Sequence, residues 1–245
     1  MITSRQNGRI QQLRKLLRSR KAREEAGLFV SDGTKLLAEA MRWWPGLETV
    51  VLSEGVEAQI PEGVEVLTVS GDIMEYISPM ESPQGALFVC RLPERRSFVP
   101  APGMILLDGI QDPGNLGTIL RTANALQVPV ALLEGCADPY SHKVVRASMG
   151  AVLRCVPVQT DWETVKAACE KENIPVAVTA LSDRAEDIRT APLGKMAVVI
   201  GSEGQGVRRE ILASAARELI IPMDAACESL NAAVAATIVM WQMKS

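Results

Sequence analysis

The segment MILLDGIQDPGNLGTILRTANAL, residues 104–126, decides the fold of the larger part of the chain. Its first four residues are all apolar, which is typical of a strand buried on both faces. A turn through Asp112, Pro113 and Gly114 follows and leads into a helix. A strand that passes through a loop into a helix is the repeating unit of a parallel α/β sheet.

The same pattern repeats toward the C-terminus. Further apolar strands are expected at residues 128–133, 176–180, 197–200 and 218–221, and helical segments alternate with them. This alternation predicts an α/β domain with a parallel sheet and helices on both faces.

A smaller α/β module is predicted before this domain. Its expected strands are 49–52, 64–69 and 86–90, and its expected helices are 34–41 and 72–77. Three prolines and a cluster of charges interrupt regular structure over residues 91–103. The predicted organisation is a small α/β domain at 1–95, a linker at 96–103 and the larger domain at 104–245.

Composition excludes several classes of protein. Of the 245 residues, 47% are hydrophobic and 22% charged, which excludes disordered and low-complexity chains. No apolar run approaches the roughly 18 residues of a membrane span, and the basic N-terminus lacks the apolar stretch of a signal peptide. We therefore expect a cytoplasmic protein. Aromatic residues make up only 4%, so a surface built mainly from stacked rings is not expected.

Cysteine and histidine usage argues against disulfides, metal sites and imidazole-based triads. The five cysteines are odd in number, scattered and never in a C-x-x-C spacing, which predicts buried free thiols; they are Cys90, Cys136, Cys155, Cys169 and Cys227. His142 is the only histidine. A catalytic site must therefore use other groups, and no metal is expected.

The net charge of −3 hides a basic N-terminal arm. Residues 1–23 contain eight basic residues and no acid: Arg5, Arg9, Arg14, Lys15, Arg18, Arg20, Lys21 and Arg23. The remainder has 18 basic and 29 acidic residues, a net charge of −11. Such an arm favours binding to a polyanion. The alternative is a solvated helix face, because four apolar residues fall at helical spacing among these charges.

Three loops that follow predicted strands carry unusual polar residues, at the edge where α/β folds bind ligands. The first contains Asn115 and, six residues later, Arg121. Six residues correspond to about 600° of helical rotation, so a shared site requires Asn115 to lie in the turn itself. A helix cap is the alternative role for Asn115.

The second loop, GSEGQG at residues 201–206, follows a buried strand. Its glycine order is not that of a dinucleotide fingerprint, and Val207 and Arg208 replace the lysine and hydroxyl of a phosphate-binding loop. What remains is a loop rich in exposed backbone with one acid, Glu203. The alternative is a glycine turn with a solvated carboxylate.

The third loop, PMDAACESLN at residues 222–231, leads into an apolar helix at 232–243. Ser229 could act simply as the N-cap of that helix. The helix is too short to cross a bilayer, so we expect it to lie in the core and to form half of a subunit interface.

Together these loops resemble the motifs of the SpoU/TrmH family of RNA ribose methyltransferases, in the SPOUT superfamily. The first motif reads DPGNLGxxxRxA over residues 112–123, the second IGSEGxG over 200–206, and the third IPM at 221–223 followed by SLN at 229–231. Residues 138–150 resemble the segment between the first two motifs. The N-terminal third is similar, more weakly, to the ribosomal-protein-like substrate-binding module of this family, although Ser31 and Asp32 stand where relatives commonly have Val and Glu.

The resemblance implies a trefoil knot, in which the C-terminal segment threads a loop, and a homodimer formed by the last helices. It also implies S-adenosylmethionine as the cofactor, held mainly by backbone groups of three loops. The cofactor-binding residues implied are Thr179, Ala180, Gly201, Ile221, Met223 and Leu230.

The implied reaction is attack of an RNA ribose 2′-hydroxyl on the sulfonium methyl group. A guanidinium stays protonated and is a poor base, so we assign Arg121 to a forked pair with the adjacent phosphate and to stabilising the developing alkoxide. Phosphate or water then accepts the proton. Asn115 orients Arg121 or the ribose, Glu203 holds Arg121 or the substrate, and Ser229 and Asn231 shape the pocket.

Ribosomal RNA is the expected substrate, because the two-domain layout resembles that of ribosomal RNA enzymes. The RNA-binding residues expected are Arg5, Arg9, Arg14, Lys15, Arg18, Lys143 and Arg146. Two alternatives stay open from the sequence: methylation of transfer RNA, and a non-catalytic RNA-binding protein whose second domain only dimerises.

Overall fold

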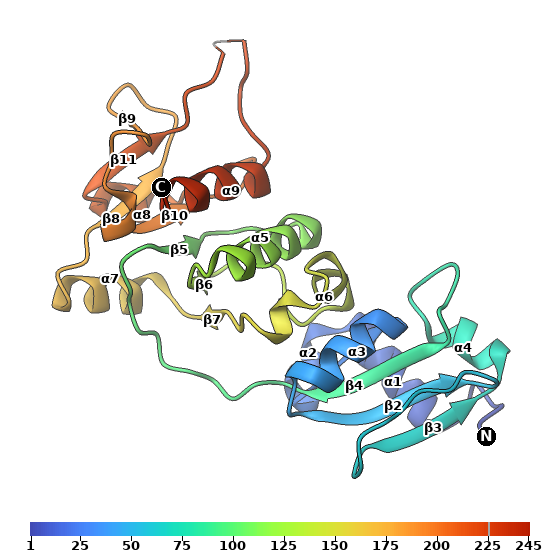
Figure 1. Ribbon diagram of the computed structural model, residues 1–245. Coiled ribbons are helices and arrows are strands. Elements are labelled where there is room, and N and C mark those ends of the chain that lie inside the picture. Colours follow the sequence, from blue (N-terminus) through green and yellow to red (C-terminus); the bar gives the residue numbers. More distant parts are fainter. Residues whose placement is uncertain (225) are drawn as a thin grey trace. The chain divides into compact units, whose positions relative to one another are not determined.

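The computed structural model describes residues 1–224 and 226–245, which form two compact units (Figure 1). The first unit contains Met1–Glu94 together with Tyr140–Arg154, and the second contains Arg95–Pro139 and Cys155–Ser245. The boundary near Glu94 lies beside the expected linker. Segment 140–154 packs with the first unit, whereas its place in the sequence groups it with the larger domain.

The first unit is built on a four-stranded sheet in the order β1-β4-β2-β3. Its strands are β1 (Leu28–Asp32), β2 (Leu47–Ser53), β3 (Glu65–Val69) and β4 (Ala86–Arg91). Its helices are α1 (Gly8–Arg18), α2 (Arg20–Ala26), α3 (Thr34–Trp43), α4 (Gly71–Ile77), α6 (His142–Ala147) and the short 3-10 helix η1 (Ala151–Leu153). β4 runs antiparallel to β1 and β2, whereas β2 and β3 are parallel.

The basic arm is a packed helix rather than a free extension. In α1, Ile10, Leu13, Leu16 and Leu17 are all buried in the core of the first unit. The charged residues between them lie on the outer side, which is the arrangement expected of an amphipathic helix. The arm therefore combines the two roles that its sequence allows, a core helix and a basic outer face.

Segment 140–154 is anchored to the first unit by a buried ion pair. Nη1 of Arg146 lies 3.1 and 3.2 Å from the two carboxylate oxygens of Asp32, whose side chain is only 2% exposed. Tyr140 packs among the rings of Phe29 and Trp44. Asp32, at the position where relatives commonly have Glu, therefore holds this segment in place.

Replacing Arg146 by alanine should lower the free energy of unfolding by about 2–3 kcal/mol, because Asp32 would be left buried without a cation. Urea unfolding of the full chain measures this loss. The control is Lys143→Ala on the same helix, since Lys143 is exposed and has no partner among the described residues. An Arg146→Ala protein as stable as the control would contradict the anchoring role.

The second unit contains a seven-stranded sheet in the order β7-β6-β5-β10-β8-β11-β9, and all neighbouring strands are parallel. The strands are β5 (Met104–Leu107), β6 (Val130–Leu132), β7 (Val158–Gln159), β8 (Val176–Thr179), β9 (Glu186–Asp187), β10 (Ala197–Ile200) and β11 (Arg217–Ile220). The helices are α5 (Pro113–Leu126), α7 (Trp162–Lys171), α8 (Arg209–Ser214), α9 (Ala232–Gln242) and the short 3-10 helix η2 (Leu193–Lys195). The predicted parallel sheet is confirmed.

Both faces of this sheet are covered. Leu106 and Val199 pack in one core with Trp162 of α7 and Ile211 of α8. The alternate strand residues, Ile105 among them, are equally buried, and on their side α9 contacts both α5 and β10. Because side chains alternate along a strand, two buried faces explain why these strands are continuously apolar.

One expectation about the cysteines is wrong. All five are free, but Cys227 is exposed, because it lies in the loop before α9 rather than in an element of the core. Cys90 and Cys169 are buried, and Cys136 and Cys155 are partly buried. Among the helices that the structure describes, none combines the length and hydropathy needed to span a membrane.

Candidate active site

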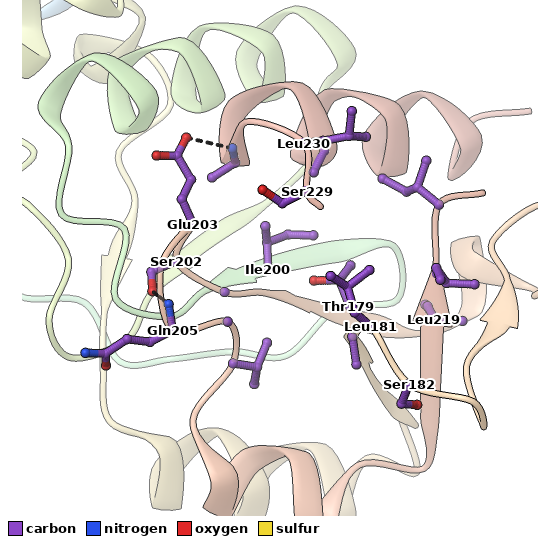
Figure 2. A pocket seen from close by; sticks show the side chains of 18 of the residues that line it. Thr179, Leu181, Ser182, Ile200, Ser202, Glu203, Gln205, Leu219, Ser229 and Leu230 are labelled. Carbon is purple, nitrogen blue, oxygen red and sulfur yellow. Dashed lines mark hydrogen bonds between the residues drawn. The ribbon is translucent and has the colours of Figure 1, made fainter. Parts of the chain in front are cut away.

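A cavity of about 540 Å³ opens at the carboxyl ends of β8, β10 and β11 (Figure 2). We call it the first cavity. The six residues expected to bind the cofactor all line it: Thr179, Ala180, Gly201, Ile221, Met223 and Leu230. Figure 2 shows Ser202, Glu203 and Gln205 on one side of the cavity, Thr179, Leu181 and Leu219 on the other, and Ser229 and Leu230 near the end of α9.

A tight hairpin forms one wall of this cavity. Ser202 and Gly206 exchange two backbone hydrogen bonds, with N···O distances of 3.2 and 2.9 Å, and Gly206 has a positive φ of 66°. We call residues 202–206 the hairpin. The glycine-rich sequence therefore makes a turn that presents Glu203 at its tip, rather than a cradle for phosphate.

Gly201 permits this turn because it has no side chain. A Cβ atom there would lie 2.2 Å from the carbonyl carbon of Gly206 and 2.3 Å from the backbone nitrogen of Val207. The close approach at Gly201 is thus made by the protein's own backbone. In the sequence interpretation, the same glycine lets the cofactor approach; in the structure, its first effect is to close the hairpin.

Residues from all three loops meet at Glu203. Its Oε1 accepts hydrogen bonds from the amide groups of Asn115 at 2.8 Å and Asn231 at 2.6 Å, and from the backbone N–H of Ala232 at 3.1 Å. Asn231 also donates to Oδ1 of Asn115 at 3.0 Å. We call these three side chains the Glu203 network. It joins α5, the hairpin and the start of α9.

The helix caps differ from the alternatives considered for Asn115 and Ser229. Asp112 is the N-cap of α5 and accepts from the backbone N–H of Asn115, so Asn115 lies inside the first turn and its side chain is free to reach Glu203. Asn231, not Ser229, caps α9 by accepting from the N–H groups of Ala233 and Val234. Ser229 is exposed and lines the first cavity.

The Glu203 network predicts different effects for two substitutions. Glu203→Ala leaves three donors without their acceptor and should lower the free energy of unfolding by about 1–2 kcal/mol. Glu203→Gln keeps an oxygen at the same position and should stay within about 0.5 kcal/mol of the wild type. Urea unfolding separates the two outcomes, and equal losses in both variants would show that the network contributes nothing to stability.

Arg121 is not part of this network. It lies on α5, is exposed, and has no hydrogen bond or ion pair with any other described residue. Because Asn115 is in the helix rather than in the turn, the two side chains are on different faces of α5. Within one chain, Glu203 therefore holds Asn115 and Asn231 and does not hold Arg121.

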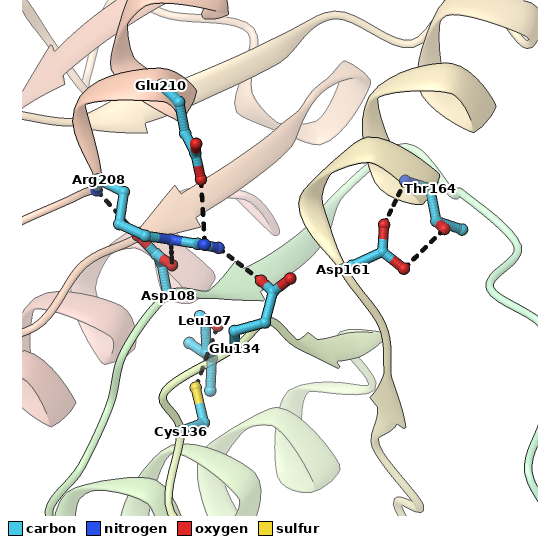
Figure 3. Close-up of polar contacts among 8 residues, drawn as sticks. All are labelled: Leu107, Asp108, Glu134, Cys136, Asp161, Thr164, Arg208 and Glu210. Carbon is cyan, nitrogen blue, oxygen red and sulfur yellow. Dashed lines mark hydrogen bonds and ion pairs between the residues drawn. The ribbon is translucent and has the colours of Figure 1, made fainter.

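An ion-pair cluster that the sequence did not point to fixes the exit of the hairpin (Figure 3). The backbone N–H and Nε of Arg208 donate to the carboxylate of Asp108 at 2.9 and 2.7 Å, and Asp108 is 1% exposed. Arg208 also pairs with Glu134 at 2.7 Å and with Glu210 at 3.1 Å. Burial opposes its charge, but Glu134 and Asp108 raise the pKa of Arg208. The only sequence signal was an acid at the end of a strand.

The expected RNA-binding residues differ in how far their charges are already paired. Arg14 lies over the ring of Tyr76 at 3.8 Å and Arg5 at 4.8 Å, and Arg9 pairs with Glu65. Arg146 is held by Asp32. The others, Lys15, Arg18 and Lys143, are exposed without an ion pair to any described residue. His142 beside them is partly buried, and burial lowers its pKa.

The first cavity suits S-adenosylmethionine. Its volume lies within the range of about 300–1,000 Å³ that is typical of small-molecule sites. Apolar side chains such as Ile200 and Leu230 line it together with the backbone of the hairpin, which can hydrogen-bond to the edges of an adenine ring. Among the residues that the structure describes, no group of three or more His, Cys, Asp or Glu side chains is arranged to hold a metal ion.

Comparisons with known proteins agree with this geometry. A family model described as the SpoU rRNA Methylase family matches residues 102–241, and one described as the MRM3-like substrate binding domain matches residues 7–87. The 23S rRNA (guanosine(2553)-2′-O)-methyltransferase RlmP of Bacillus subtilis is 30% identical over 248 residues, covering 99% of this chain and 98% of its own.

Two further relatives have the same two-part organisation over most of this chain. The AdoMet-bound rRNA methyltransferase from Sinorhizobium meliloti has a TM-score of 0.87 and 27% identity, covering 99% of this chain and 96% of its own. The human mitochondrial rRNA methyltransferase 3 is 26% identical over 301 residues, covering 96% of this chain and 72% of its own. The chain therefore belongs to the SpoU rRNA methylase family.

Proposed function

We propose that this protein transfers a methyl group from S-adenosylmethionine to a ribose 2′-hydroxyl of ribosomal RNA. The observation that carries the proposal is the first cavity, which is lined by all six expected cofactor residues and borders the Glu203 network. The relatives in Bacillus subtilis and Sinorhizobium meliloti are named as rRNA methyltransferases, and the second was crystallised with AdoMet.

The chain's own residues then divide the work of positioning. S-adenosylmethionine supplies an electrophilic methyl group when bound in the first cavity. Arg121, exposed and without a partner among the described residues, binds the phosphate beside the target ribose through a forked pair and stabilises the developing alkoxide. Phosphate or water accepts the proton. Asn115, held by Glu203, orients the ribose rather than Arg121, and Ser229 and Asn231 shape the pocket.

The assembly is proposed as a knotted homodimer. The knot is supported by the path of the C-terminal segment, which leaves β11 and returns in α9 to pack on α5 and β10. The dimer is supported by two exposed apolar residues on α9, Val234 and Trp241. We propose residues 1–95 as the RNA-binding domain, 96–103 as the linker and 104–245 as the methyltransferase domain, acting in the cytoplasm where ribosomal RNA is assembled.

The test is methyl transfer from labelled S-adenosylmethionine to total RNA from cells that lack this protein. Wild type should label a ribosomal RNA band, and Arg121→Ala should not. Label in small RNA instead would transfer the activity to transfer RNA. Absence of both label and cofactor binding would leave a non-catalytic RNA-binding protein and overturn the proposal.

The outer face of α1 should bind RNA phosphates. Removing the whole arm would unfold the first unit, because its apolar residues are buried, so the test is the double variant Lys15→Ala, Arg18→Ala. Its RNA affinity should fall, and the slope of log affinity against log salt should fall by about 0.7–0.9 for each RNA phosphate that is no longer neutralised. Gln12→Ala, an exposed residue of the same helix, is the control. An unchanged slope would remove α1 from the RNA interface.

A further inference from the structure

A second cavity, of about 820 Å³, lies on the other side of the hairpin. It is lined by the loops after β5 and β6, including Asp108–Asp112, Glu134 and Gly135. Ser202–Val207 and Ala232 line both cavities. The hairpin is therefore a wall shared by two cavities, and the Glu203 network lies on their border.

The charges that line the second cavity are largely paired within the protein. Arg208 is bound by Asp108, Glu134 and Glu210, and Asp112 accepts the N–H of Asn115. The next residue, Arg209, also lines the cavity, yet it is exposed and makes no hydrogen bond or ion pair with another residue in the described part of the chain. The same is true of Gln111.

This arrangement selects among ligand classes. The interior contains the carboxylates of Asp108, Asp112, Glu134 and Glu203, which disfavour a phosphate and favour neutral hydrogen-bond donors. Ribose hydroxyls and the N–H groups of a nucleobase are such donors. A phosphate fits only at the exposed Arg209, whose guanidinium is free to make a forked pair.

We propose that the second cavity holds the target nucleoside of the RNA, and that Arg209 binds a backbone phosphate next to it, distinct from the phosphate assigned to Arg121. The inference rests on the proposed function and adds the site of the acceptor. It places the ribose on one side of the hairpin and the cofactor on the other, with Asn115 and Glu203 between them.

Two variants test the cavity without touching the Glu203 network. Arg209→Ala should raise the KM for RNA about tenfold and reduce the salt slope of RNA binding by about 0.7–0.9, with kcat and cofactor affinity within about twofold of wild type. Gln111→Trp fills the cavity from a residue without partners in the described structure. It should abolish methyl transfer and leave cofactor affinity unchanged.

The matched control is Lys171→Ala, which removes one exposed positive charge at the end of α7, just before β8 begins and thus at the opposite edge of the sheet. If Arg209→Ala behaves like this control, or if Gln111→Trp methylates RNA at the wild-type rate, the second cavity is not the acceptor site. If wild type binds RNA but transfers no methyl group, the proposed function fails. The salt slope of Arg209→Ala still decides the inference in that case, because RNA binding is measured without turnover.

Discussion

Gly201→Ala should bind S-adenosylmethionine at least about 100-fold more weakly than the wild-type protein, or not at all. The added Cβ would lie 2.2 to 2.5 Å from three backbone atoms of Gly206 and Val207, a separation that no rotamer change relieves. The hairpin must therefore move, and it forms a wall of the first cavity. Isothermal titration with the cofactor measures the loss.

Gly204→Ala is the matched control. It lies in the same hairpin, but a Cβ there meets nothing within 4 Å, and its φ is not in the left-handed region. Cofactor affinity should stay within about threefold of wild type, since a new methyl group enters open space and costs little at a permissive position. If the two variants bind the cofactor equally well, the position of the hairpin does not determine cofactor binding.

Arg121→Lys should lose most of the turnover, about 100-fold in kcat, although its positive charge is kept. The reason is geometric: lysine offers one ammonium where arginine offers two parallel N–H donors to a phosphate. Because Arg121 is exposed and unpaired among the described residues, stability and cofactor affinity should not change. Steady-state kinetics with saturating cofactor, beside cofactor titration and thermal unfolding, measure all three.

The comparison of Arg121→Lys with Arg121→Ala separates charge from shape. If the fork matters, the two variants should be nearly equal in kcat. Near-normal turnover by Arg121→Lys would sink this role and leave the residue as a point charge. Recovery of most of the rate by lysine relative to alanine would lead to the same conclusion.

The strands of the second unit could be predicted from sequence because they are buried on both faces. Residues 104–107 and 197–200 are apolar without interruption, and their observed ends coincide with the expected ones. The two-residue strands β7 and β9 could not be found this way, since so short a segment has no period to detect. β1 was missed because it mixes apolar residues with Ser31 and Asp32.

Contacts between distant parts of the chain set the limit for the site. The resemblance brought the three loops together, but nothing local shows that Glu203 bonds Asn115 and Asn231 rather than Arg121. Nor could Asp108 and Arg208, 100 residues apart, be paired from their types alone. The N-caps were misassigned because several Ser, Asp and Asn residues precede each helix, and only the backbone conformation decides which of them caps it.

The packing of segment 140–154 also governs how the protein can be dissected. The chain passes between the two units near Glu94, again after Pro139 and once more after Arg154, so three covalent connections join them. A protease that cuts the linker at 96–103 would leave two fragments still associated, because Arg146 and Tyr140 keep their partners in the N-terminal fragment. Conversely, residues 104–245 expressed alone would expose Tyr140, Val144 and Val145 to water, so this fragment would be prone to aggregation.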